Sequence, residues 1–102
     1  MKIYISGPIT GHRDAGWKFK AAEERMKKSG HKVVNPFELF KTVDDMFDHA
    51  TILKACLALL PGCECIYMMN GWQESKGAQR ELEEAERLGL AVWYGGDQGG
   101  KA

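Results

Sequence analysis

The residue best suited to chemistry is a glutamate on the apolar side of a predicted helix that follows Ser75 and runs to Leu88. At 100° per residue, one arc of this helix is polar, and the other carries Ala78, Leu82, Ala85 and Leu88. Glu81 falls inside the apolar arc, so its carboxylate is expected to face the sheet. Burying a charge is costly unless something compensates it, which makes Glu81 a candidate catalytic residue. The same pattern also allows a carboxylate at the edge of the arc that reaches solvent.

Two chain segments could bind an anion. The loop Gly7-Pro8-Ile9-Thr10-Gly11 has glycines that let the backbone approach a ligand, and its free N–H groups suit a negative charge. Ser75 stands at the start of the predicted helix, where its hydroxyl and the neighbouring amides could hold a phosphate. The alternative interpretation is an ordinary turn and an ordinary serine cap, because both are common.

Three aromatic side chains lie near these segments. Tyr4 is close to the end of the first predicted strand, so its hydroxyl could reach the site. A strand tyrosine that simply packs in the sheet gives the same pattern. Trp17 and Trp72 either wall the pocket or fill the core, and the sequence leaves both alternatives open.

Strand and helix patterns alternate along the chain. Strand patterns cover Lys2–Ser6, Lys32–Val34, Cys63–Met69 and Leu90–Tyr94, and helix patterns cover Ala15–Ser29, Val43–Leu60 and Ser75–Leu88. This order predicts an α/β fold, a single-domain three-layer sandwich with a parallel sheet of four or five strands. Ligands of such sheets bind beyond the carboxyl ends of the strands. Three segments should meet there, namely 7–13, the Asn35-Pro36 turn and 70–77.

Length and charge fit one small domain without a polymeric partner. The chain has 102 residues, and we expect a domain over 1–94 followed by a flexible, glycine-rich tail over 95–102. Fourteen basic and fourteen acidic residues cancel, which leaves no charge footprint for nucleic acid or a membrane surface. No apolar run approaches the roughly 20 residues of a membrane span, and a strand pattern follows Met1 directly. We therefore expect a cytoplasmic protein that binds small molecules.

A homodimer is expected because a chain this short buries only a modest share of its surface. Met46, Phe47, Trp72 and Trp93 are the apolar side chains predicted to supply that interface.

The three cysteines, Cys56, Cys63 and Cys65, are an odd number, which fits a reducing compartment better than a disulfide scaffold. Cys63 and Cys65 would point to opposite faces of one strand, and no second Cys/His pair lies at zinc spacing. Neither a metal nor a cofactor is expected.

Several short motifs follow one another in a recognisable order: Ile3–Gly11 (IYISGPITG), Cys63–Tyr67 (CECIY), Gly71-Trp72, Ser75 and Gly77–Glu81 (GAQRE). In this order they resemble the nucleoside 2-deoxyribosyltransferase superfamily, most nearly its short branch common in bacteriophages and bacteria. The resemblance covers roughly residues 2–94. It implies a flavodoxin-like fold and an activity that cleaves N-glycosidic bonds.

The resemblance also implies roles for single residues. Glu81, in a Gly-x-x-x-Glu segment, would attack the anomeric carbon, Tyr4 would orient it, and Gly7 would belong to the phosphate- or sugar-binding loop. Six residues before the nucleophile, transferases acting on free nucleosides carry an aspartate. The 2′-deoxynucleoside 5′-phosphate N-hydrolases carry a phosphate-holding serine there, and this chain has Ser75. The resemblance therefore favours a 5′-phosphorylated substrate.

One position departs from that pattern. Both groups of enzymes carry an aspartate, the general acid, eight residues before an acidic residue that precedes the third main strand. Counting back from Glu64 gives Cys56, and a thiol is a weak substitute for protonating a leaving base. Asp44, Asp45 and Asp48 are alternative acids, although nothing in the spacing demands one of them.

The leading hypothesis is N-glycosidic cleavage or deoxyribosyl transfer on a (deoxy)nucleoside 5′-monophosphate, with a glutamate nucleophile. The alternative is a non-catalytic module that binds a nucleotide or a nucleotide-derived signal, which the Cys56 substitution favours. Glu81 and Tyr4 are the predicted catalytic residues. The predicted substrate-binding residues are Gly7, Pro8, Ile9, Thr10, Gly11, Cys56, Gly71, Trp72, Ser75 and Gly77.

Overall fold

Parallel strands form the centre of the molecule. The computed structural model describes residues 1–9 and 11–95, and within them four strands pair in the order β2-β1-β3-β4. These strands are β1 (Lys2–Ser6), β2 (Lys32–Val34), β3 (Cys65–Met68) and β4 (Ala91–Tyr94). Every pairing is parallel, and Tyr4 of β1 lies opposite Val34 of β2 and Ile66 of β3. The predicted parallel sheet is therefore confirmed.

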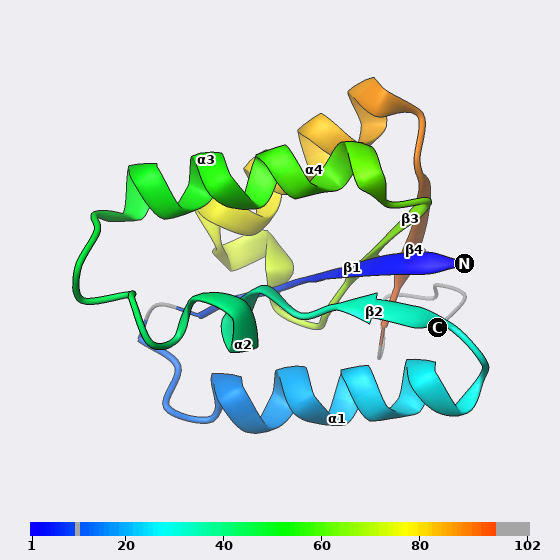
Figure 1. Cartoon of the computed structure of the whole chain (residues 1–102), viewed down its shortest axis with the longest axis horizontal. Coiled ribbons are helices and arrows are strands. Elements are labelled where there is room, and N and C mark those ends of the chain that lie inside the picture. The colour runs from blue at the N-terminus through cyan, green and yellow to red at the C-terminus, as the bar shows by residue number, and fades with distance from the viewer. Residues whose placement is uncertain (10, 96–102) are drawn as a thin grey trace.

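Helices cover both faces of this sheet (Figure 1). On one side lies α1 (Ala15–Lys28), with the short α2 (Pro36–Phe40) near its amino-terminal end. On the other side lie α3 (His49–Leu59) and α4 (Lys76–Leu88). Two 3₁₀ turns, η1 (Leu60–Gly62) and η2 (Trp72–Glu74), precede β3 and α4 respectively. The three predicted layers are present.

The alternation of side chains along β1 divides the core into two halves. Ile3 and Ile5 pack with Phe19, Ala22 and Met26 of α1. Tyr4 packs in the other half, among the buried residues of β3, α3 and α4. A different helical layer covers each half. Glu81, the candidate catalytic residue, lies in the same half as Tyr4.

The region between β2 and α3 differs from its prediction. The helix predicted over Val43–Leu60 begins only at His49, because the Asp48 carboxylate accepts the Thr51 N–H at 2.8 Å and caps it there. A further helix, α2, occupies the predicted Asn35-Pro36 break. The Asn35 side chain accepts the Glu38 N–H at 3.2 Å, and proline is tolerated in the first helical turn.

The other helix ends follow their sequence signals more closely. Ser75 caps α4 through an Ala78 N–H bond of 3.1 Å, and Gly89 ends that helix with a φ of 78°. Asp14 directly precedes α1, but its side chain makes no capping bond and instead pairs with Lys18 at 3.3 Å.

Most of the predicted tail, together with Thr10, lies outside the described residues. Gly95 alone of 95–102 is described; it is buried, and its N–H donates to the Met68 carbonyl at 2.9 Å. In the part of the chain that the structure describes, no helix combines the length and the apolar character needed to span a membrane.

Candidate active site

The Glu81 carboxylate is buried and held by two hydroxyl groups. Its side chain is 7% exposed, although the residue is acidic. The Tyr4 hydroxyl donates to Oε2 at 2.6 Å, and the Ser6 hydroxyl donates to Oε1 at 2.6 Å. Glu81 faces the sheet as the helical periodicity predicts, and the Tyr4 hydroxyl reaches it.

Strand and helix geometry bring these three residues together. Tyr4 and Ser6 are two positions apart on β1, so both side chains point to the same face of the sheet. On that face α4 packs with Ala78, Leu82 and Ala85 buried, and Glu81 shares their side of the helix. Ser6 is a site residue that the sequence analysis missed. Its position two residues after Tyr4 was the available signal.

Burial sets the protonation of the groups around Glu81. It raises the pKa of the Glu81 carboxyl, and hydrogen bonds from Ser6, Tyr4 and Cys56 partly offset that rise. Burial also raises the pKa of Tyr4 far above its ordinary value, with the Glu81 charge adding to the effect, so the phenol remains a donor. Burial raises the pKa of the Cys56 thiol to about 11. Cys56 is therefore a neutral thiol at physiological pH.

Glu81 borders a cavity of about 990 Å³ at the carboxyl end of the sheet. Segments from the loop after β1, from α2, from α3 and from the start of α4 line it. One part of the lining is apolar and includes Pro8, Ile9, Pro36, Phe37 and Phe40. Another part is polar or charged and comprises His12, Lys41, Asp44, His49, Glu74, Lys76 and Arg80. The lining thus combines an apolar surface with a balanced set of charges, because Lys41, Lys76 and Arg80 are matched by Asp44, Glu74 and Glu81.

The amino-terminal end of α4 also opens onto this cavity. Ser75, Lys76, Gly77 and Ala78 all contribute to the lining. The Ser75 oxygen accepts the Ala78 N–H, and this cap leaves the hydroxyl proton available to a ligand. The first amides of a helix have no partner within the helix and favour an anion. The second anion segment predicted from the sequence therefore adjoins the cavity.

Different features of the structure favour glycine at the positions in the first loop and in the 70–77 segment. A Cβ added to Gly7 would lie 3.0 Å from the Met69 Cβ, so the close passage of two chain segments favours glycine there. Gly11 and Gly71 adopt left-handed conformations, with φ of 78° and 88°, that other residues rarely adopt. Gly77 has neither restriction.

The predicted site residues divide into those that line the cavity and those that do not. Those in the lining are Gly7, Pro8, Ile9, Cys56, Ser75, Gly77 and Glu81. Tyr4 lies behind Glu81 with no exposed surface, whereas Gly11, Gly71 and Trp72 are not part of the lining. Of the alternative acids, Asp44 lines the cavity, Asp48 caps α3, and Asp45 does neither.

The tryptophans have separate environments. Trp17 is 73% exposed and therefore does not fill the core. Trp72 packs against Tyr94 with ring centroids 5.9 Å apart, and Trp93 packs against the core on the α1 side. Trp72 and Trp93, expected as exposed interface surface, are thus partly buried. Met46 and Phe47 are exposed, at 67% and 50%.

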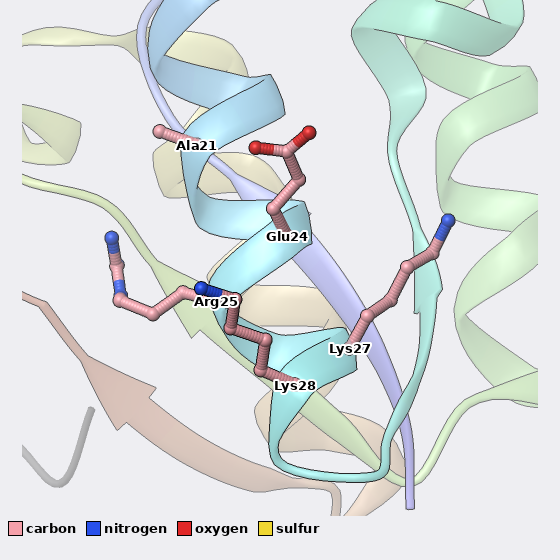
Figure 2. A pocket seen from close by; sticks show the side chains of 5 residues that line it. All are labelled: Ala21, Glu24, Arg25, Lys27 and Lys28. Carbon is pink, nitrogen blue, oxygen red and sulfur yellow. The ribbon is translucent and has the colours of Figure 1, made fainter.

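A second hollow lies on the outer surface of α1 and is lined by Ala21, Glu24, Arg25, Lys27 and Lys28 (Figure 2). All five residues belong to one helix, and the long side chains extend in different directions. This hollow shares no residue with the Glu81 cavity. Among the described residues, no group of three or more histidine, cysteine, aspartate or glutamate side chains could hold a metal ion.

Comparisons with known proteins agree with the fold. The sequence model of a protein family described as "Domain of unknown function (DUF4406)" matches residues 1–94. No curated protein matches the chain. A solved structure of 2-deoxyribosyltransferase from the psychrotolerant bacterium Bacillus psychrosaccharolyticus is similar, with a TM-score of 0.73 and 19% identity. The match covers 92% of this chain and 71% of that one. The two proteins share a flavodoxin-like α/β fold.

Proposed function

The chain belongs to the DUF4406 family, and we propose that it cleaves the N-glycosidic bond of a (deoxy)nucleoside 5′-monophosphate with Glu81 as the nucleophile. The observation that carries this proposal is the Glu81 carboxylate itself. It is buried, both of its oxygens accept hydroxyl hydrogen bonds, and it borders a cavity large enough for a nucleotide. The similar fold of a solved 2-deoxyribosyltransferase supports the same class of reaction.

The proposed reaction proceeds through a covalent glycosyl–enzyme ester. A Glu81 oxygen forms a bond to C1′ while the bond from C1′ to the base nitrogen breaks, and the base leaves with the electron pair. The transition state resembles an oxocarbenium ion, which an adjacent carboxylate stabilises. Water or a second base then attacks C1′ and releases Glu81. The first acceptor gives hydrolysis and the second gives glycosyl transfer.

The amino-terminal end of α4 is the proposed phosphate site. Ser75 and the first amides of α4 adjoin the cavity, and the loop after β1 contributes Gly7, Pro8 and Ile9. Lys76 and Arg80, at the start of α4, add positive charge to this part of the lining, which favours a phosphate-bearing substrate. Phe37 and Phe40 offer aromatic surface on which a base could stack.

Protonation of the departing base is the step for which the site offers the weakest group. Cys56 occupies the position where the resemblance implies an aspartate, and burial raises the pKa of its thiol to about 11. Such a thiol is a weak acid for this purpose. Asp44 is a carboxyl group of the lining that could substitute for it.

A second candidate function follows from the same observation. If no group protonates the base, the cavity binds a nucleotide or a nucleotide-derived signal without cleaving it. The neutral Cys56 thiol favours this alternative, whereas the hydroxyl-bound Glu81 favours the enzyme.

We also propose that the protein acts as a homodimer in the cytoplasm. Met46 and Phe47 expose apolar surface between α2 and α3, and a second subunit could cover it. The cysteines of the chain are free, which fits a reducing compartment.

Incubation with a panel of ribonucleoside and deoxyribonucleoside 5′-monophosphates, followed by chromatography for free base, tests the enzymatic proposal. Release of base from at least one nucleotide, and slower release from the matching nucleoside, is expected. Binding of a nucleotide by calorimetry without release from any of them would favour the second candidate.

A further inference from the structure

Ser6 contacts the candidate nucleophile from inside the protein. It has no exposed surface and does not line the cavity, so it has no route to a bound ligand. Its hydroxyl donates to Oε1 of Glu81 at 2.6 Å, whereas Tyr4 occupies Oε2. Any effect of Ser6 on the reaction must therefore act through Glu81.

Neutral groups supply the compensation for the Glu81 charge. Among the residues that the structure describes, no lysine or arginine forms an ion pair with Glu81. The titratable groups that interact with it are Tyr4 of β1 and Cys56 of α3. The other titratable or charged side chains around the cavity are His12, Lys41, Asp44, His49, Glu74, Lys76 and Arg80. Removal of one hydroxyl donor should consequently have a large effect.

We propose that Ser6 is a positioning residue that keeps the Glu81 carboxylate ionised and fixes Oε1, so that the anion is ready to attack at neutral pH. This inference rests on the proposed function. A hydrogen bond donated to a carboxylate favours the charged form, and burial opposes that form. Burial raises the pKa of Glu81, and the hydrogen bond from Ser6 counteracts part of that rise.

Loss of this hydrogen bond has a distinctive signature. Without the Ser6 donor, a larger fraction of Glu81 holds a proton at a given pH, so the acid limb of the activity profile moves to higher pH. The anion that does form is more basic and is no worse a nucleophile, so activity recovers at alkaline pH. A residue with a merely structural role would lower activity at every pH without moving the limb.

The experiment compares Ser6→Ala with wild type for base release against pH. On the acid limb we expect about a tenfold loss of rate, because one charge-assisted hydrogen bond is worth about that factor, with recovery toward the wild-type rate at alkaline pH. Ile5→Val is the matched control, because it removes a methyl group from the same strand on the opposite face. Its profile should overlay that of wild type. Equal loss for Ser6→Ala at all pH values would overturn the inference.

A carboxyl-carbon NMR titration of Glu81 in wild type and Ser6→Ala separates this inference from the proposed function. If wild type releases no base, the proposed function fails, but a Glu81 titration displaced to higher pH still supports the effect of Ser6 on its charge. An unmoved titration overturns the inference whether or not base is released. If Ser6→Ala does not fold, Ser6→Cys provides a side chain of similar size and a weaker donor. It should displace the titration in the same direction.

Discussion

Tyr4 and Glu81 are 77 residues apart in the sequence, and their side chains meet in a buried hydrogen bond of 2.6 Å. The bond joins the first strand to the last helix across one half of the core. It also leaves the phenol as a donor, because burial raises the pKa of Tyr4 and suppresses its ionisation. A neutral phenol next to a buried carboxylate both orients the carboxylate and compensates part of its charge.

Tyr4→Phe should therefore lower base release about tenfold or more, because Oε2 loses its charge-assisted hydrogen bond. Tyr67→Phe is the matched control. Tyr67 is also a buried strand tyrosine, but it packs on the α1 side and its hydroxyl accepts from Arg25 at 2.7 Å. Rates measured side by side should fall for Tyr4→Phe alone. Equal losses in the two variants would show that any buried hydroxyl has this effect.

The stability of the fold should depend on pH through Glu81. Burial raises the pKa of Glu81 in the folded chain above its ordinary value of 4.5. As the pH rises above 4.5, the unfolded chain loses this proton first, so the free energy of unfolding falls until the folded carboxyl has also ionised. Below 4.5, both states hold the proton and this contribution to pH dependence disappears.

Glu81→Gln carries no ionisable group at this position, so it should remove this fall in the free energy of unfolding. Near neutral pH the variant should be more stable than wild type by roughly 1–3 kcal/mol, and the difference should shrink toward pH 4. Urea unfolding of both proteins across this pH range measures it, and the other carboxylates cancel in the comparison. A difference that does not vary with pH would contradict a raised Glu81 pKa.

Ser75→Asp tests the phosphate site without breaking helix α4, because aspartate is as good a helix cap as serine. The added negative charge should weaken binding of a 5′-monophosphate by about tenfold or more, and should affect the matching nucleoside much less. Ser29→Asp, at the exposed carboxyl end of α1, is the control and should change neither affinity. Equal weakening of both ligands, measured by calorimetry, would argue against a phosphate role for this residue.

The proposed homodimer predicts twice the chain mass in light scattering at tens of micromolar. Replacing Met46 and Phe47 together by glutamate should shift the protein to monomer, since both side chains are exposed and apolar. Ala58→Glu, an exposed position on α3, is a control for the added charge. A wild-type monomer at these concentrations would rule out the proposal.

Local patterns predicted the elements that carry strong signals of their own. Helix α4 has a clear apolar arc and a serine cap, and the position of Glu81 on that arc favoured the burial that the structure shows. The start of α3 was wrong because Val43 and Met46 extend the apolar spacing, although a local bond at Asp48 begins the helix later. Periodicity alone does not distinguish apolar residues in an exposed turn from apolar residues in a helix.

Ser6 shows what sequence patterns of this kind cannot provide. Its partner Glu81 is 75 residues away, so their contact depends on how α4 lies against β1, and neither segment encodes that placement by itself. The same limit applies to Trp17, which an apolar composition places in a core or a pocket wall. The structure leaves it 73% exposed.

Base release by Glu81→Ala beside wild type, on a nucleotide that wild type cleaves, tests most directly whether Glu81 is the nucleophile. The variant leaves the buried Tyr4 and Ser6 hydroxyls without their acceptor, which should lower its stability, but the folded variant should still bind the nucleotide. A thermal melt and a calorimetric titration check both conditions. Wild type should release base, and the folded, nucleotide-binding variant should release none. Release by Glu81→Ala at the wild-type rate would contradict this prediction and remove Glu81 from the mechanism.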